Sequence, residues 1–521
     1  MWVVPFFFTK MHLLILCLDN THRGGVMGQI GVWSNRIGII FSLLATMVFA
    51  DTDSPSFYGK RAVAPIENAP ESPVLTFQRR SIVITPTQDP MLSEVAIKES
   101  VKTATISELN AKHSSSDSIE RTTDFLPLIE LSRNEKLLAK KAHYYFERNW
   151  NKSTGFTDSV QGYHHVTMWD VGSDISAQLS LEGLGLQSIE LTNTKLERLL
   201  NTLLTMPLYQ NKLPNREYNA KTGKPSGRYS KTNNNGNGWS ALDIGRLLIW
   251  LHILTQEKPQ LAPLVNDIII AWSLASAVHD QTLYGTKLGS KGEYYRQEGR
   301  LGYLQYAAFG FSLFGFDVSA SYEKKDVTQV NIDGILFYID GRNMPFSTPD
   351  PYVLTRLELG DFTQWWEQLD TIYLLHKQKE KQTKRVWVFA EDAMNRTPWF
   401  AYNNLFFYGK SWLSTSSGGK PVEVFQTFSN KVALGLSVIY DDDYSKRLSE
   451  RVVSNSLSYR SIPTGVYSDR SINTAYNINT NSMILSSLLY KMRNRTAMLP
   501  ISIIRHNESK DLVGGSQENN E

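Results

Sequence analysis

The chain has 521 residues, of which 41% are hydrophobic and 11% aromatic, enough for a large buried core in one big domain or two to three ordinary ones. Its 54 basic and 51 acidic residues leave a net charge of +3, and the basic ones are not clustered. The charge distribution therefore excludes a protein that binds nucleic acid through a basic field.

An apolar run near the N-terminus has the features of a targeting segment. Residues 37–49 (IGIIFSLLATMVF) follow Arg36 and end before Ala50 and a polar stretch. Thirteen apolar residues are few for a bilayer span but suit a signal peptide. We expect residues 1–50 to be a signal peptide or an N-terminal membrane segment, with Met27 as the more ordinary start. An uncleaved segment would act as a membrane anchor.

Cysteine usage points to the same compartment. The only cysteine is Cys17, inside that N-terminal segment. Disulfides, thiolate catalysis and cysteine-based zinc sites are therefore excluded for the rest of the chain. An exported, cysteine-free chain suits a bacterial periplasm.

The rest of the chain divides by composition. Residues 51–125 are rich in Pro, Ser and Thr and are predicted to be a flexible linker, with a possible strand at 74–85. Residues 126–495 form the folded domain, and 496–521 are a polar tail.

Helical periodicity dominates the folded domain. Six helical hairpins closed into a ring, an (α/α)6 barrel, are the economical packing for twelve helices, because no 34-residue repeat indicates a solenoid. Alternating patterns at 327–340 and 385–389 predict short β excursions. The helices are expected at 133–150, 173–185, 191–206, 239–255, 260–279, 300–316, 351–358, 361–379, 400–409, 429–440, 444–458 and 475–492.

The first polar loop, GYHHVTMWDVGSD (162–174), precedes a helix. Ser173 or Asp174 would be an ordinary N-cap, whereas Asp170, next to Trp169, is harder to explain by capping. Adjacent histidines at 164 and 165 point to opposite faces of a strand and lack metal-ligand spacing, so no metal site is expected.

Two further loops carry single acids beside aromatic rings. Trp239 opens a helix on which Asp243 and Arg246 have the spacing of an internal ion pair. Glu298 lies among tyrosines that include Tyr303. Partial desolvation there would raise its pKa and suit a general acid, although a partner for the helix dipole is the plainer interpretation.

The remaining loops contribute more carboxylates. Residues 349–360 carry Asp350 and Glu358, the stretch from 389 to 409 begins with the adjacent pair Glu391 and Asp392, and residues 463–484 place Tyr467 and Asp469 before the last helix. Phosphate-binding and GxSxG motifs are missing from the sequence. Cleavage of a glycosidic bond needs a carboxylic acid, a second carboxylate and rings that hold sugars, and these loops offer that set.

Several of these stretches together resemble a bacterial family, the domain of unknown function numbered 3131. They are MWDVGSDISA, GWSALDIGRLL, EGRLGYLQYAAFGF, DPYVLTRLELG, AEDAMNRTPWFAYN and GVYSD with NINTNSMILSSLLY, within about residues 135–493. The family is similar in fold to glucoamylase-like (α/α)6 barrels, including bacterial β-1,2-glucanases. The resemblance implies a carbohydrate-active enzyme. The chain departs from it at Asp350 and Asp469, where relatives usually have Glu, so both carboxylates reach one methylene less far.

The resemblance also implies roles. In glucoamylase-like barrels the acid follows the fifth helix and the base precedes the last, which assigns Glu298 as general acid and Asp469 as general base. Inversion would follow if their carboxyl groups are about 6.5–9.5 Å apart. Glu391 and Asp392 are the reserve pair. The expected substrate contacts are Trp169, Asp170, Trp239, Tyr303, Asp350, Glu358, Glu391, Asp392 and Tyr467.

The leading hypothesis is thus an exported glycoside hydrolase that cleaves a glucan or exopolysaccharide without a metal or cofactor. A non-catalytic polysaccharide-binding or assembly factor would use the same cleft. A polysaccharide lyase is a third reading, with Tyr467 as base and Arg470 neutralising a uronate.

Overall fold

The computed structural model describes residues 128–499 except 228, 229, 231, 291, 342, 343 and 361–367. The predicted targeting segment, the linker with its strand at 74–85, and most of the polar tail lie outside these residues. None of the described helices combines the length and apolarity needed to cross a membrane.

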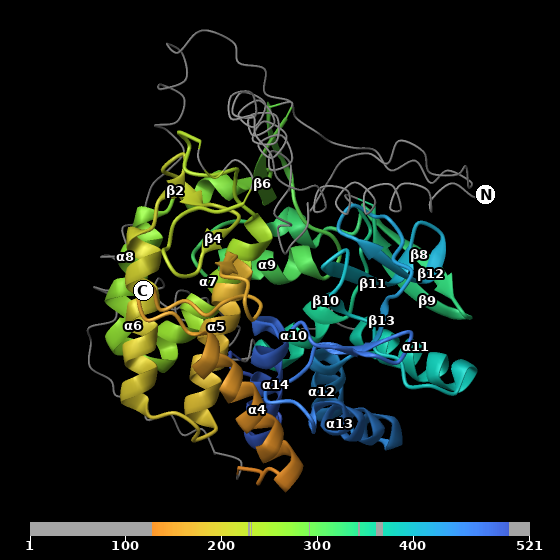
Figure 1. The fold of residues 1–521 in the computed structure, drawn as a ribbon. Coiled ribbons are helices and arrows are strands. Elements are labelled where there is room, and N and C mark those ends of the chain that lie inside the picture. Colours follow the sequence, from red (N-terminus) through yellow and green to blue (C-terminus); the bar gives the residue numbers. More distant parts are fainter. Residues whose placement is uncertain are drawn as a thin grey trace, which may run out of the picture. The chain divides into compact units, whose positions relative to one another are not determined.

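Eleven α-helices dominate the described part of the chain (Figure 1). They are α4 (Arg133–Asn149), α5 (Met168–Gly183), α6 (Ile189–Thr205), α7 (Ala241–Glu257), α8 (Ala262–Ala271), α9 (Tyr303–Ser312), α10 (Asp350–Glu358), α11 (Gln368–Thr383), α12 (Asn430–Ile439), α13 (Asp443–Ser456) and α14 (Ile478–Met492).

Short antiparallel strands fill the connections. They are β1 (His165–Val166) with β4 (Tyr218–Asn219), β2 (Leu208–Tyr209) with β3 (Leu213–Pro214), β5 (Val278–His279), β6 (Thr282–Gly289) and β7 (Gly292–Gln297), β8 (Val327–Ile332) with β9 (Ile335–Asp340), β10 (Glu391–Ala393), β11 (Phe400–Phe407) and β12 (Lys410–Ser416), and β13 (Gln426–Ser429), β14 (Gly465–Tyr467) and β15 (Ile472–Asn473).

Six helices form an inner layer. Helix α5 packs against α7, α7 against α9, α9 against α10, α10 against α12, α12 against α14, and α14 against α5. Most residues of α5, α7, α9, α12 and α14 are buried around the whole circumference, as expected of helices covered on all sides. Helices α4, α6, α8, α11 and α13 pack outside them and bury a single face.

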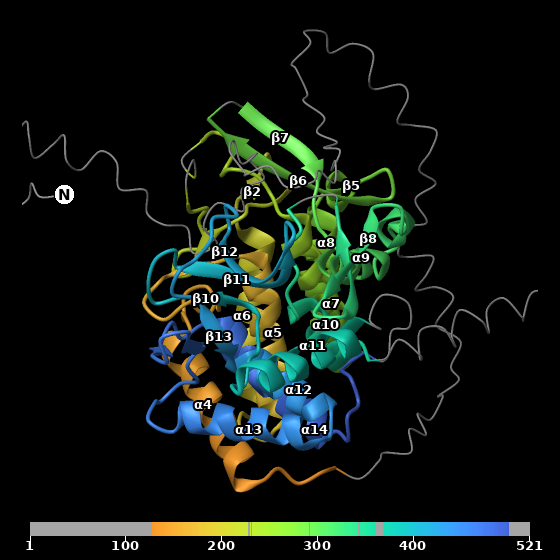
Figure 2. The same ribbon diagram turned by 90° about the vertical axis from the view of Figure 1, so that its right-hand side faces the viewer.

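The long connections of the inner layer lie at one end of its helices. Every inner helix is preceded in the chain by at least two strands or by β1, whereas most turns from an inner helix to the following outer helix are short. In Figures 1 and 2 the strands gather at one end of the helices. Many loops therefore lie at the N-terminal ends of the inner helices.

One predicted helix is wrong. Most of the predicted helix 400–409 forms strand β11 (Phe400–Phe407), which pairs with β10 on one side and with β12 on the other. The stretch FAYNNLFF is aromatic-rich, and a short apolar run does not distinguish a strand from a buried helix. The Asn404 amide donates to the carbonyl oxygens of Tyr402 and Leu413, which fixes the hairpin.

The β predictions fare differently. Residues 327–340 are confirmed as the β8–β9 hairpin. The stretch 385–389 contributes only an isolated bridge between Val388 and Phe428.

Candidate active site

A cluster of three carboxylates surrounds one lysine at the N-terminal end of α10 and α12. Lys431 Nζ lies 2.7 Å from Asp350 Oδ1 and 3.5 Å from Asp392 Oδ1, and it donates to the carbonyl oxygen of Glu391 at 2.6 Å. The Glu391 amide donates to Asp350 Oδ2 at 2.9 Å. All four side chains are buried. The cluster thus joins β10, α10 and α12.

One cation cannot balance three carboxylates. Burial raises the pKa of Asp392 to about 8. The positive charge of Lys431 opposes this shift, and the negative charges of Asp350 and Glu391 add to it. The same carboxylates hold the pKa of Lys431 above its ordinary value despite its burial. In such a coupled group the proton belongs to the whole cluster. The cluster therefore retains a proton near neutral pH.

A hydrogen-bonded chain leads from this cluster toward the surface. Gln426 Nε2 donates to Asp392 Oδ2 at 2.5 Å, and Asn473 Nδ2 donates to Gln426 Oε1 at 2.8 Å. The backbone N–H of Asn395 donates to Asn473 Oδ1 at 3.2 Å, and the Tyr467 hydroxyl donates to Asn395 Oδ1 at 2.8 Å.

Asp469 lies exposed, two residues after Tyr467. Its Oδ1 accepts from the Ser471 hydroxyl at 2.5 Å, and Arg396 Nη1 lies 3.0 Å from its Oδ2. These contacts, led by Ser471, lower the pKa of Asp469 to about 2. The Arg396 guanidinium also covers the Tyr467 ring at 4.0 Å. Burial raises the pKa of Tyr467, and the charges of both Asp392 and Asp469 add to this effect, so the ring lies within range of both acids.

Aromatic rings border the carboxylate cluster. Tyr303 is buried, and its hydroxyl pairs with Thr348 Oγ1 at 2.7 Å. Burial and the charges of Glu391 and Asp350 raise its pKa well above the ordinary value. Its ring centroid lies 5.9 Å from that of Trp169. The predicted substrate residues Trp169, Tyr303, Asp350, Glu391 and Asp392 thus lie in one neighbourhood.

Asp170 has a capping role that the sequence reading assigned to its neighbours. Thr167 is the N-cap of α5, and Asp170 Oδ2 accepts from its backbone N–H at 3.0 Å, completing a capping box. Asp170 Oδ1 accepts from Asn479 Nδ2 of α14 at 2.9 Å. Asp174 lies inside the helix, because α5 begins at Met168 and not near 173, and burial raises its pKa.

Glu298 and Trp239 meet at the start of α7. Glu298 Oε1 pairs with Arg216, and its Oε2 accepts from the Ala241 backbone N–H at 2.7 Å. Trp239 is buried and donates from Nε1 to the Tyr284 carbonyl at 3.1 Å. Glu298 follows the fifth described helix and Asp469 precedes the last, the places that the sequence analysis expected for them, although eleven helices are described and not the twelve expected.

Glu358 lies away from the cluster, at the C-terminal end of α10. It is buried against Arg246, with Nη1 and Oε1 3.1 Å apart, and also accepts from Tyr306. The prediction that Arg246 pairs with Asp243 is wrong, because the arginine reaches across the helix interface to α10 instead of along its own helix.

The two histidines pair with different acids. His164 Nδ1 lies 2.7 Å from Asp158 Oδ2, and His165 Nδ1 lies 2.7 Å from Glu217 Oε1. The prediction that they point apart is confirmed. Within residues 128–499, gaps aside, no group of three or more His, Cys, Asp or Glu side chains is arranged so that it could hold a metal ion.

Sequence reasoning missed several members of this site. The local sequence around these residues does not indicate which side chains they contact. They are Lys431, Arg396, Gln426, Asn473 and Arg300. The signal for Lys431 was present in part, since a lysine in the first turn of an apolar helix opposes the helix dipole and needs acidic neighbours.

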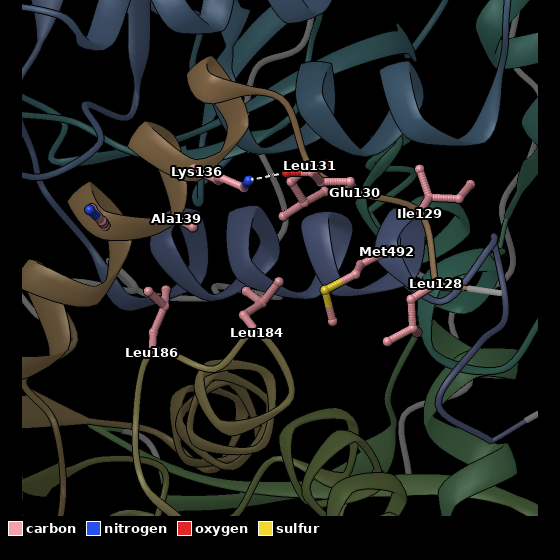
Figure 3. A pocket seen from close by; sticks show the side chains of 10 residues that line it. Leu128, Ile129, Glu130, Leu131, Lys136, Ala139, Leu184, Leu186 and Met492 are labelled. Carbon is pink, nitrogen blue, oxygen red and sulfur yellow. Dashed lines mark hydrogen bonds and ion pairs between the residues drawn. The ribbon is translucent and has the colours of Figure 1, made fainter.

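A groove opens at the opposite end of the inner helices (Figure 3). Leu184, Leu186 and Met492, at the C-terminal ends of α5 and α14, line it together with residues 128–131. Its volume is about 440 Å³ and its lining is mainly apolar, so it lacks the carboxylates gathered at the loop end.

The family's sequence profile matches residues 137–494; its description reads protein of unknown function (DUF3131). The chain belongs to the DUF3131 family. The resemblance read from the loop motifs is thereby confirmed. No curated protein sequence matches the chain.

Several solved structures have a similar fold. A candidate glucoamylase from Bacteroides caccae has a TM-score of 0.55 at 13% identity, covering 72% of this chain and 96% of its own. An endo-β-1,2-glucanase from Chitinophaga pinensis, solved with sophorotriose and glucose, has a TM-score of 0.52 at 12% identity, covering 71% and 96%. At these identities the likeness shows the fold, which is of the helix-rich α/α-barrel class.

Proposed function

We propose that the protein is a glycoside hydrolase that cleaves a glucan or related polysaccharide. The observation that carries this proposal is the buried cluster of Asp350, Glu391 and Asp392 around Lys431, next to aromatic rings at the loop end of the helices. Two acids with separated pKa values near one site are the requirement for acid/base cleavage. The Chitinophaga pinensis glucanase of similar fold acts on β-1,2-glucan, which makes that polymer the first substrate to try.

The proposed donor is the carboxylate cluster, whose proton at the Asp392 site persists to about pH 8. The proposed base is Asp469, which is ionised above about pH 2 and is exposed to the water it would activate. Glu298 suits the donor role less well, because both its oxygens accept hydrogen bonds from Arg216 and the start of α7. It is better explained as an anchor for that loop.

We propose further that the inner helices close into an (α/α)6 barrel. Their pairwise contacts run in chain order and return from α14 to α5. Five outer helices alternate with them. The β8–β9 hairpin takes the sixth outer position, between α9 and α10.

The lyase alternative finds less support. Burial raises the pKa of Tyr467 to about 12, and its hydroxyl donates to Asn395. A tyrosine base needs a pKa nearer the working pH.

Export remains part of the proposal. Residues 1–50 would direct the chain to the periplasm, either as a cleaved signal or as an anchor. N-terminal sequencing of the protein recovered from a periplasmic extract and from membranes tests this directly. Recovery of the intact chain from the cytosol alone would refute it.

The activity test uses the purified full-length protein on β-1,2-, β-1,3- and β-1,4-glucans, α-glucans and bacterial exopolysaccharides, read by new reducing ends. Asp350→Asn, Glu391→Gln, Asp392→Asn and Asp469→Asn are compared with Glu298→Gln. We expect loss of at least about 100-fold in Asp469→Asn and in one or more cluster variants, since proton transfer contributes that much. Loss in Glu298→Gln with full activity in every cluster variant would instead assign the acid to Glu298. Absorbance near 235 nm would indicate lyase products.

The pH profile provides a second test. The rate should fall as the pH rises through about 8, when the cluster loses its proton, and as the pH falls toward 2, when Asp469 gains one. Ser471→Ala removes the main contact that lowers the pKa of Asp469. It should move the acidic limb upward and leave the alkaline limb in place. A shift of both limbs together would contradict the assignment of two separate groups.

A further inference from the structure

Arg300 is a buried cation with an unusual environment. It lies between β7 and α9 and is 7% exposed. Its guanidinium carbon lies 4.4 Å from the ring centroid of Tyr303, 4.8 Å from that of Phe346 and 5.3 Å from that of Tyr402. These rings favour the positive charge through their faces but accept no conventional hydrogen bond from its N–H groups.

The guanidinium has unmet hydrogen-bonding capacity. Within the described part of the chain, Nε and Nη2 of Arg300 are buried and have no acceptor, and no carboxylate forms an ion pair with the side chain. The one other described arginine buried to this degree, Arg246, is paired with Glu358. A buried charge without such partners costs free energy in the unliganded protein. A ligand that supplied the acceptors would recover that cost.

The positions of Nε and Nη2 in Arg300 indicate which chemical group the ligand would present. Nε and Nη2 lie on the same edge of the guanidinium plane, and their N–H bonds run parallel. That edge is the one that takes both oxygens of a carboxylate in a bidentate pair. A neutral sugar hydroxyl would satisfy one of the two donors and leave the charge uncompensated.

The carboxylates near Arg300 would repel an anionic ligand, so such a ligand would need the positive charge of Arg300. Tyr303 lies within electrostatic range of the carboxylates and of Arg300, because Glu391 and Asp350 raise the pKa of Tyr303 while Arg300 lowers it. Lys431 is already used by Asp350, Asp392 and the Glu391 carbonyl. An anion bound beside the cluster would be repelled by these carboxylates unless Arg300 met it.

We propose that Arg300 binds an anionic substituent of the substrate polysaccharide, and that this substituent is the carboxylate of an acidic sugar. The proposal rests on the proposed function and names its substrate class as acidic polysaccharides. The bidentate edge provides the attraction, and the rings of Tyr303, Phe346 and Tyr402 hold the guanidinium flat.

Binding is the appropriate test, because it does not depend on cleavage. The probes are one β-glucan, the same glucan with its primary alcohols oxidised to carboxylates, and the same glucan sulfated, titrated by calorimetry into the full-length protein. The wild type should bind the oxidised glucan about tenfold more tightly than the neutral one, the value of one good charge-assisted pair. In Arg300→Met this ratio should fall to about one.

Two controls separate the role of Arg300 from folding and from general charge. Arg451→Met removes a cation from the exposed face of α13 and should leave the ratio unchanged. Arg300→Lys keeps the charge but loses the parallel donors, and should lose most of the preference. Thermal unfolding of Arg300→Met should occur at the wild-type temperature or above, because an unpaired buried charge is removed. A lower temperature would indicate a structural partner and overturn the proposal.

The remaining outcomes are distinct. Equal affinity for neutral and oxidised glucan in the wild type, or an unchanged ratio in Arg300→Met, would overturn the proposal. An Arg300-dependent preference for the sulfated glucan over the oxidised one would overturn the carboxylate as the ligand and assign a sulfate ester to the anionic site. Failure of every glycan to be hydrolysed, with the Arg300-dependent ratio intact, would count against the hydrolase and not against this site.

Discussion

Buried charges in this protein are held by several contacts each. Arg246 lies 3.1 Å from Glu358, donates to Tyr306 at 2.5 Å and to Ser173 at 3.2 Å, and covers the Trp169 ring at 4.9 Å. These contacts keep the pKa of Arg246 above its ordinary value, although burial acts to lower it. The arrangement connects α5, α7, α9 and α10 in the interior of the inner layer.

Removing one partner of this pair should be costly. Arg246→Met leaves Glu358 buried without its cation, so we expect the free energy of unfolding to fall by about 3–5 kcal/mol. Lys136→Met, which breaks the exposed pair with Glu130, should leave the free energy of unfolding nearly unchanged. Denaturant unfolding measures both. Adding Glu358→Gln to Arg246→Met should recover part of the loss; a further loss would mean that Glu358 is not the uncompensated charge.

At the scale of elements, glycines set how closely α7 and α9 approach. A Cβ at Gly310 would lie 2.0 Å from the Gly245 carbonyl oxygen, and one at Gly245 would lie 2.3 Å from the Ala307 carbonyl oxygen. The clashes involve backbone atoms, which rotamer changes cannot relieve. Two inner helices therefore touch backbone to backbone, and this contact positions the loop that carries Glu298 and Arg300.

Gly310→Ala should force the two helices apart. We expect a loss of about 1–3 kcal/mol in the free energy of unfolding, the usual range for overpacking, even though alanine is the better helix former. In Gly418→Ala the nearest atom is Ser416 Oγ at 3.8 Å, and the φ angle is not in the left-handed region, so this control should be nearly neutral. Equal Tm values for the two variants would show that the interface can relax.

At the scale of the whole molecule, stability should depend on pH through a few buried groups. Burial lowers the pKa of His376 to about 4, where Nδ1 donates to the Ile372 carbonyl and Nε2 accepts from the Phe389 amide. Its protonation removes stability as the pH falls from about 6.5 to 4. Asp392 acts in the opposite sense, because its raised pKa removes stability as the pH rises from about 4 to 8.

These opposing slopes predict a broad maximum of stability between about pH 4 and 6.5, with a decline up to about pH 8. Below pH 4 the lowered pKa of Asp469 adds a loss as its carboxylate is protonated. Tm measured across this range tests the profile. Asp392→Asn should flatten the decline above pH 6.5 and turn the plateau between about pH 4 and 6.5 into a rise with pH, because the His376 slope is then unopposed, and it should leave the loss below pH 4 unchanged. A variant that kept the wild-type slope would place the proton elsewhere in the cluster.

The sequence alone determined the elements whose signal is local. Helical spacing located all eleven described helices, although it placed the start of α5 too late, because each inner helix is apolar over its own length. The loop motifs identified the family and brought Trp169, Asp350, Glu391 and Asp392 into consideration, since a carboxylate next to a ring is visible along the chain. The strand at 400–407 was not predicted, because its pairing with β10 and β12 is not local. Its composition fits a strand as well as a buried helix.

Only the tertiary structure decided which charges meet. Arg246 pairs with Glu358, 112 residues away, and not with Asp243 on its own helix. Lys431 pairs with acids from β10 and α10. Helix packing brings such residues together at distances that no spacing rule contains. It also sets their burial, which raises the pKa of Asp392 and lowers that of His376. Residue types are therefore encoded locally, whereas their protonation and partners are properties of the packed molecule.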